Sequence, residues 1–79
     1  MLKEVKSVYF SGINGIGMSG LAKILCKQGY TVYGSDLEIK PVTEDMQEMG
    51  IKVYIGQKEE NLSDKKIDLF VYSTAIKDT

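Results

Sequence analysis

A glycine-rich segment near the amino terminus has the composition of a loop that binds a diphosphate. It reads SGINGIGMSG over residues 11–20 and follows the apolar run Val8-Tyr9-Phe10. Glycines at such a turn let backbone amides approach phosphate oxygens, and the free N–H groups of the following helix favour an anion. We therefore predict a diphosphate site here. The alternative is that these glycines only shape the turn between a strand and a helix.

Two registers of the dinucleotide-binding pattern G-x-G-x-x-G fit the segment. Gly12-x-Asn14-x-x-Gly17 lies at the right distance from the strand but has asparagine in the middle. Gly15-x-Gly17-x-x-Gly20 matches every letter but begins late. We prefer the first register, because asparagine tolerates left-handed backbone better than most residues. The Asn14 side chain is then expected to crowd a ligand.

Polar residues follow two later apolar runs. Asp36 comes about twenty residues after the glycines, at the distance where a carboxylate contacts ribose hydroxyls in dinucleotide-binding folds. It could equally contact a base edge, or serve only as a turn-forming or helix-capping aspartate. Ser73 and Thr74 follow the last apolar run, where such folds bind ligands, although hydroxyls are also common in turns.

The elements that must position these residues alternate between strand and helix patterns. β-prone runs cover residues 8–10, 31–33, 52–55 and 67–72. A helical stripe ends at Gly29, and a second, shorter helix runs from Pro41 to Gly50. The apolar residues of the first stripe recur at helical spacing: Met18, Leu21, Ala22, Leu25 and Cys26. We predict an α/β fold with a Rossmann-like, open, doubly wound parallel sheet in the order 3-2-1-4.

Size and composition limit the function further. The 79 residues allow one domain, and a doubly wound sheet usually has five or six strands, so we expect a truncated part of a longer polypeptide. A net charge of −1 and the absence of a long apolar run argue against nucleic-acid and membrane partners and favour the cytoplasm. The chain has no histidine, one cysteine and no Walker-type loop, so we expect neither a metal site nor triphosphate binding in it.

The segment FSGINGIGMSGLA strongly resembles the opening of the UDP-N-acetylmuramate:L-alanine ligases, ATP-dependent enzymes of peptidoglycan and cell-wall synthesis. The resemblance continues through Gly34-Ser35-Asp36 to Tyr72-Ser73-Thr74-Ala75-Ile76, nearly the whole chain. It implies that residues 1–79 are an N-terminal Rossmann-like domain that binds the UDP part of UDP-N-acetylmuramate. A central domain that binds ATP and magnesium, and a C-terminal domain that helps bind ATP and L-alanine, are then absent, and no catalytic residue lies in this stretch.

The resemblance assigns the substrate contacts to three places: the glycine loop at the diphosphate, residues 35 and 36 toward the uridine, and residues 73–75 along the same cleft. The residues are Gly12, Asn14, Gly15, Ile16, Gly17, Met18, Ser35, Asp36, Ser73, Thr74 and Ala75.

Three departures from the family pattern affect these roles. Asn14 replaces the usual middle glycine, Tyr9 lies where histidine is frequent, and Gln57 follows Gly56 where Gly-His is common. Two other functions stay open. One is the recycling ligase that attaches murein peptides to UDP-N-acetylmuramate, although Gly-Met-Ser favours the alanine ligase. The other is an NAD-binding regulatory or dehydrogenase domain, which the same loop and acid would serve.

Overall fold

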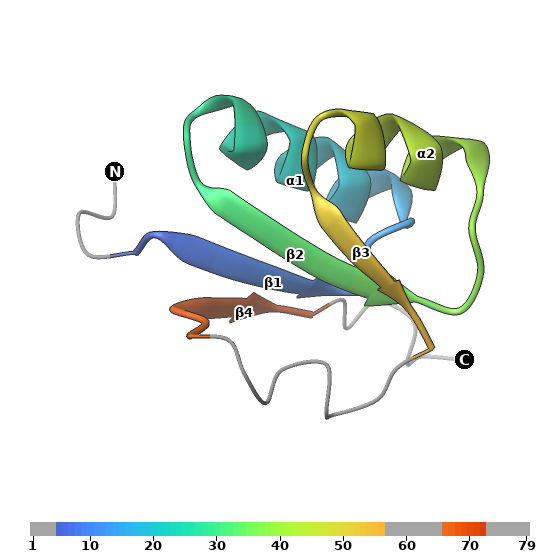
Figure 1. The fold of residues 1–79 in the computed structure, drawn as a ribbon. Helices are drawn as coiled ribbons and strands as arrows, with labels where there is room; N and C mark the ends of the chain where they lie inside the picture. Colours follow the sequence, from blue (N-terminus) through green and yellow to red (C-terminus); the bar gives the residue numbers. More distant parts are fainter. Residues whose placement is uncertain (1–4, 57–65, 73–79) are drawn as a thin grey trace.

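The computed structural model describes residues 5–56 and 66–72, and its described elements alternate as expected (Figure 1). Their order is β1 (Ser7–Ser11), α1 (Ile16–Lys27), β2 (Thr31–Asp36), α2 (Pro41–Glu48), β3 (Lys52–Ile55) and β4 (Leu69–Val71). All neighbouring strands pair in parallel, in the order β3-β2-β1-β4. The predicted fold class and strand order are therefore confirmed.

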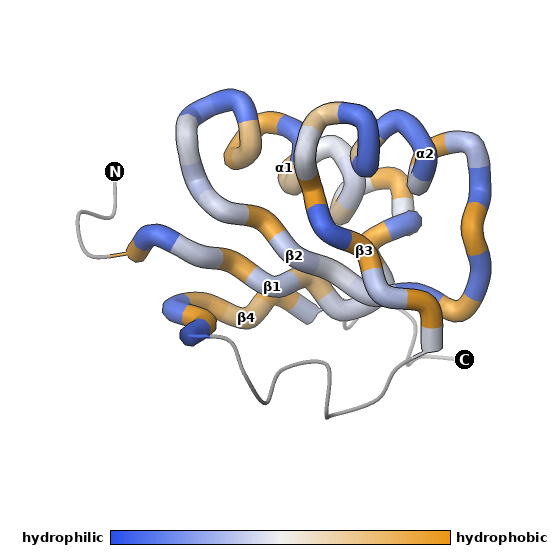
Figure 2. Tube along the Cα trace, in the orientation of Figure 1, coloured by the Kyte–Doolittle hydropathy of each residue, from blue (hydrophilic) through white to orange (hydrophobic). Residues whose placement is uncertain are grey.

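Both described helices cover the same face of the sheet, and the hydrophobic core lies between them and the strands (Figure 1). Figure 2 shows hydrophobic residues within the strands and a hydrophilic turn after α1. Each fully buried aliphatic or aromatic side chain contributes about 1.5–3 kcal/mol relative to an exposed one. The buried core comprises Val8, Phe10, Ile13, Ala22, Leu25, Val32, Met46 and Ile51.

Both helices end in the same glycine motif, as the sequence predicted. Gly29 and Gly50 have φ values of +100° and +102°. Tyr30 N–H donates to the Leu25 carbonyl and Gly29 N–H to the Cys26 carbonyl, and α2 repeats this pair of bonds. These bonds satisfy the last carbonyls of each helix and turn the chain directly into the next strand.

The face of the sheet away from the helices carries aromatic residues. Tyr9 alternates with the core residues Val8 and Phe10, so its side chain lies on this second face. It is buried, and its ring centroid lies 5.9 Å from that of Phe70 in β4. Tyr9, one of the three departures noted in the sequence, is thus a packing residue of this face.

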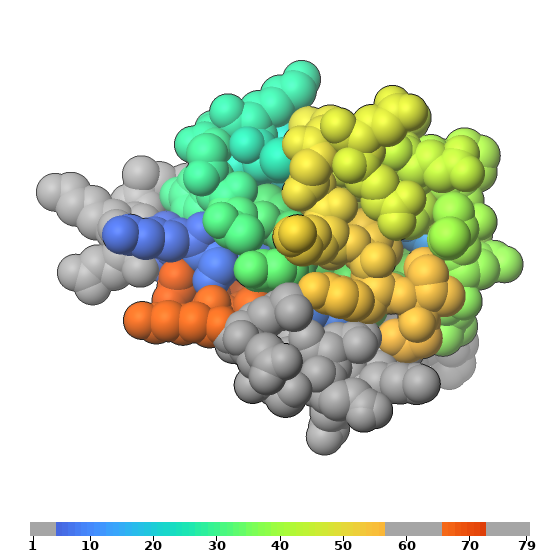
Figure 3. Space-filling model, in the orientation of Figure 1, coloured from blue at the N-terminus to red at the C-terminus, as the bar shows by residue number. Residues whose placement is uncertain are grey.

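The strand order places a topological switch point between β1 and β4. From β1 the chain moves toward β3 in two steps, and β4 then lies on the other side of β1. In the space-filling view, α2 and β3 form the yellow-to-orange surface at one edge, and β4 lies at the other (Figure 3). Ligands of open α/β folds bind beyond the carboxyl ends of the strands at such a switch point. The glycine loop lies there, directly after β1.

Candidate functional site

The glycine loop begins with a tight turn at Gly12. This residue follows the last residue of β1 and has a φ of +78°, which favours glycine. Its N–H and that of Ile13 both donate to the Ser35 carbonyl, at 2.9 and 3.0 Å. Gly15 N–H then closes the turn on the Gly12 carbonyl at 3.2 Å. The first glycine of the preferred register therefore occupies the turn that the pattern requires.

A buried isoleucine anchors this loop on β2. The Ile13 side chain is fully buried and lies directly over Gly34. A β-carbon at Gly34 would lie 2.3 Å from Ile13 Cδ1 and 2.8 Å from Ile13 Cβ. The sequence alone did not predict that Gly34 makes room for Ile13, although a glycine inside a strand often marks the close approach of another segment.

Among the described residues, no side chain caps the start of α1. Gly15 is the N-cap residue, with extended backbone and no side-chain hydrogen bond, and the first turn contains no acidic residue. The first N–H groups of a helix have no partner within the helix, and they carry the positive end of its dipole. Nothing lies within 4 Å of a β-carbon built at Gly17. This end of α1 is therefore open to an anion.

Two apolar residues of the predicted site lie beside these amides. Ile16, the first residue of α1, is 93% exposed. Met18 is half-buried and packs against the core. Both residues can offer only backbone N–H groups to a phosphate.

Asp36, at the end of β2, connects the glycine loop to the next turn. Its Oδ2 accepts a hydrogen bond from Asn14 N–H and its Oδ1 accepts one from Leu37 N–H, each at 2.8 Å. Its carbonyl accepts from Gly56 N–H. The turn-forming role is thus present, and each carboxylate oxygen keeps a lone pair for a ligand.

Asn14 differs from expectation in its backbone, and its side chain has two hydrogen-bond partners. Among the described residues only glycines have positive φ, so Asn14 does not adopt the left-handed conformation for which it was favoured. Its side chain is bound to the segment between β2 and α2 and to α2 itself, because Nδ2 donates to the Glu38 carbonyl at 2.9 Å and Oδ1 accepts from the Thr43 hydroxyl. Whether this side chain crowds a ligand stays a prediction.

Thr43, in the first turn of α2, is the residue that sequence reasoning missed. It is fully buried, and its Oγ1 donates to Asn14 and accepts from Lys40 N–H at 3.0 Å. A threonine three residues after the N-cap residue, here Lys40, is a weak local signal of such capping. Its contact with the glycine loop joins residues 29 positions apart, which no local pattern reveals.

The remaining predicted residues divide into one that is described and three that are not. Ser35 is buried, and its carbonyl holds the loop as described above. Its contact with a uridine stays a prediction. Ser73, Thr74 and Ala75, like Gln57, lie outside the described residues.

The amino end of the sheet has a second aspartate. Asp68, just before β4, accepts hydrogen bonds at Oδ2 from Lys6 N–H at 2.8 Å and Ser7 N–H at 3.0 Å. These two bonds, with smaller contributions from the Ser7 hydroxyl and the Lys66 charge, hold the pKa of Asp68 below its usual value of 3.8. The Ser7 hydroxyl in turn donates to the Lys66 carbonyl at 2.7 Å. This cluster attaches β4 to β1.

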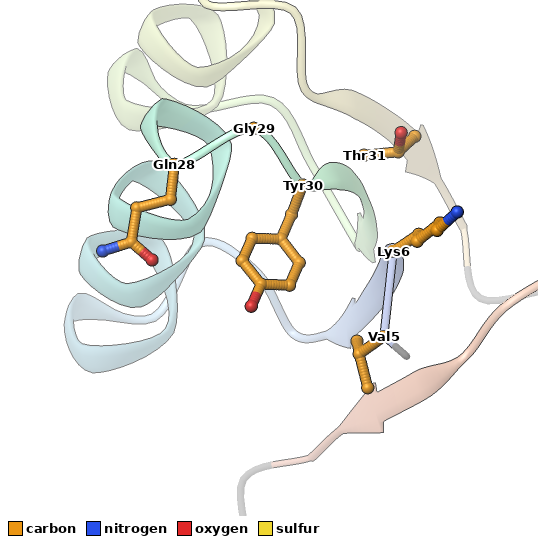
Figure 4. Close-up of a pocket in the computed structure, with 6 residues that line it drawn as sticks. All are labelled: Val5, Lys6, Gln28, Gly29, Tyr30 and Thr31. Carbon is orange, nitrogen blue, oxygen red and sulfur yellow. The ribbon is translucent and has the colours of Figure 1, made fainter. Parts of the chain in front are cut away.

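A shallow hollow of about 470 Å³ lies at the same amino end (Figure 4). Tyr30 and Gln28 line it from the α1–β2 turn, and Val5 and Lys6 line it from the start of the chain. It is at the opposite end of the strands from the glycine loop, and none of the described residues that line it is buried. We therefore place the candidate site at the loop.

The described part of the chain has neither a metal-binding cluster nor a membrane-spanning helix. No group of three or more cysteine, aspartate or glutamate side chains is arranged there to hold a metal ion. No helix in those same ranges has the length and apolar character to cross a membrane.

Comparison with protein families gives one match that covers most of the chain. The family model described as "Mur ligase family, catalytic domain" matches residues 7–79.

Among curated proteins, similar sequences are UDP-N-acetylmuramate–L-alanine ligases. That of Sulfurihydrogenibium sp. is 46% identical over 74 residues, and that of Dinoroseobacter shibae is 50% identical over 74 residues. Each match covers 94% of this chain and 16% of the relative. The chain therefore spans only about a sixth of the length of these relatives.

Solved structures give the same fold. A UDP-N-acetylmuramate-alanine ligase from Thermotoga maritima matches with a TM-score of 0.80 and 32% identity, over 94% of this chain and 16% of that one. A murein peptide ligase from Psychrobacter arcticus matches with a TM-score of 0.82 and 30% identity, over 92% of this chain and 15% of that one. The TM-scores are thus nearly the same for the two kinds of ligase.

Proposed function

Because the chain belongs to the Mur ligase family, we propose that residues 1–79 are the N-terminal UDP-binding domain of a UDP-N-acetylmuramate:L-alanine ligase. In this proposal the domain holds the UDP part of the substrate and contributes no catalytic residue. The matching family model is described as a catalytic domain. We assign to this stretch the substrate-positioning part of that activity.

The open amino end of α1 is the observation that carries the proposal. The N–H groups of Ile16, Gly17 and Met18 lie at a helix start with neither a capping side chain nor an acidic residue. A diphosphate placed there gains charge-assisted hydrogen bonds and the favourable end of the helix dipole. Gly15 and Gly17 leave the approach open, since no side chain projects from either residue.

The other proposed contacts surround this anion site. Asp36 and the Ser35 backbone fix the loop, and the Asp36 carboxylate is proposed to accept from ribose hydroxyls or a base edge as well. Ser73, Thr74 and Ala75 are proposed to border the same cleft, because they follow β4, the strand across the switch point.

The complete reaction needs domains beyond these residues. In the proposed enzyme, ATP phosphorylates the muramate carboxylate, and the alanine amine attacks the resulting acyl phosphate to form an amide, releasing ADP and phosphate. ATP, magnesium and L-alanine are proposed to bind to a central and a C-terminal domain, and the enzyme is proposed to act in the cytoplasm. This domain contributes orientation of the substrate, which in favourable cases lowers a barrier by roughly 7–11 kcal/mol.

The recycling ligase is the second candidate. Among solved structures, two murein peptide ligases match at 30–33% identity and the alanine ligase at 32%, so these identities do not separate the candidates. Among curated proteins, alanine ligases match at 46–50% identity. Identity to these curated proteins therefore favours the alanine ligase, although both candidates bind the same UDP substrate.

Calorimetric titration with UDP-N-acetylmuramate, UDP and NADH tests the proposal. Gly17→Val should weaken binding of the UDP ligands about 100-fold or more, because a branched side chain displaces the diphosphate from charge-assisted hydrogen bonds of about 1.5–3 kcal/mol each. Gly20→Val is the matched control. It adds the same side chain to an exposed helical position that has equal space but lies one turn further from the helix start.

The outcomes separate the alternatives. Loss of UDP binding in Gly17→Val with retention in Gly20→Val supports the diphosphate site and the preferred register. Equal affinities of the two variants would overturn the site, and a preference for NADH over both UDP ligands would overturn the ligase assignment.

A further inference from the structure

We propose that the side-chain amide of Asn14 and the hydroxyl of Thr43 form a clamp that holds the glycine loop in its ligand-binding position. We call this pair the Asn14–Thr43 clamp. Its effect on ligand binding rests on the proposed function, whereas its effect on the loop rests on the hydrogen bonds alone.

Asn14 is bound to the end of β2 and to the residues after it by three separate hydrogen bonds. Its backbone N–H donates to Asp36 Oδ2 and its Nδ2 to the Glu38 carbonyl, while its Oδ1 accepts from the Thr43 hydroxyl. All three partners lie within residues 36–43. The amide therefore fixes the middle of the glycine loop to the start of α2, across the end of β2.

Thr43 uses both functions of its hydroxyl. The proton is donated to Asn14, and a lone pair accepts from Lys40 N–H, the N-cap amide of α2. Because Thr43 is fully buried, it does not reach a ligand at the surface. It is a positioning residue, and any effect on ligand binding must pass through Asn14.

The loop needs such a clamp because glycines flank Asn14. Gly12 and Gly15 restrict the chain less than other residues, so their ordering costs more conformational entropy. A loop that is ordered before the ligand arrives spares that cost on binding. A glycine at position 14 would lose both side-chain bonds, which explains physically what asparagine adds here.

Amide hydrogen exchange measured by NMR tests the clamp directly. In Thr43→Val, which keeps the shape but removes the hydroxyl, exchange of the Asn14 and Gly15 amides should accelerate about tenfold relative to the β1 amide of Tyr9, as expected for one lost hydrogen bond. Thr43→Ser keeps the hydroxyl and should exchange like the original chain. If loop and strand amides accelerate together, or if neither changes, the clamp is wrong.

A double-mutant cycle tests whether Thr43 acts through Asn14. Thr43→Val should weaken UDP binding about tenfold in the original chain, yet cause no further loss once Asn14→Gly has removed its partner. Additive losses would overturn the clamp's role in binding. If the original chain binds no UDP ligand, the proposed function fails, and hydrogen exchange alone then decides the clamp.

Discussion

Each end of the parallel sheet contains an aspartate that accepts hydrogen bonds from two backbone amides, but the two aspartates support different structures. Asp68 at the amino end accepts from Lys6 and Ser7 with one oxygen and attaches β4 to β1. Asp36 at the carboxyl end accepts from Asn14 and Leu37, one with each oxygen. The first joins two strands, whereas the second orders a loop.

The difference shows that position in the fold, more than residue type, decides what such an aspartate can do. Next to Asp36 lie the open helix start and the switch point, where a ligand can bind. Within the described ranges, Asp68 lies beside the starts of β1 and β4 and lines a shallow hollow. A carboxylate bound to backbone amides is therefore evidence of order, whereas the helix-start amides, which no described side chain caps, are what indicate a ligand.

The largest expected effect is at Gly34, on which the carboxyl end depends. Gly34→Ala should lower the free energy of unfolding by about 1–3 kcal/mol, because the new β-carbon would overlap the buried Ile13 side chain. Chemical denaturation measures this loss. Gly20→Ala, where the space is open, should instead raise stability by about 0.5–1 kcal/mol, since alanine favours a helix over glycine. Equal stability of both variants would contradict the packing of Ile13 on β2.

The next effect separates the two aspartates by function. Asp36→Ala should weaken UDP binding about tenfold or more. The variant loses the charge-assisted hydrogen bond from Asn14 N–H, of about 1.5–3 kcal/mol, and this frees the glycine loop. Asp68→Ala should leave that affinity unchanged, since its bonds lie at the other end of the strands. Titration calorimetry on both variants is the measurement. Similar losses of affinity would show that the ends are not independent.

Much of the fold was predictable because it depends on local signals. Strand and helix patterns, with the glycines that end each helix, were sufficient for the order β3-β2-β1-β4. β4 is shorter than its predicted apolar run of residues 67–72, extending only over Leu69–Val71.

The site was less predictable because its contacts are long-range. The glycine pattern located the loop, but it treats position 14 as backbone and so gave Asn14 the wrong conformation. The direction of that side chain depends on Thr43, and the need for Gly34 depends on Ile13. Each pair meets only after β1 and β2 have paired.

The smallest expected effect is the pH dependence of the amino end. Because the folded pKa of Asp68 lies below its ordinary 3.8, the unfolded chain binds more protons near that pH, and the stability from this group is present above 3.8. It is lost as the pH falls through the folded value. Asp68→Asn should therefore be less stable than the original chain at about pH 7 and equal to it at the acid limit, by a small margin because the carboxylate is exposed. Denaturation at several pH values compares the two chains. If the stability difference between the two chains stays the same in acid, the charge of Asp68 does not hold β4 to β1. The contrast between the two aspartates would then not rest on their charges.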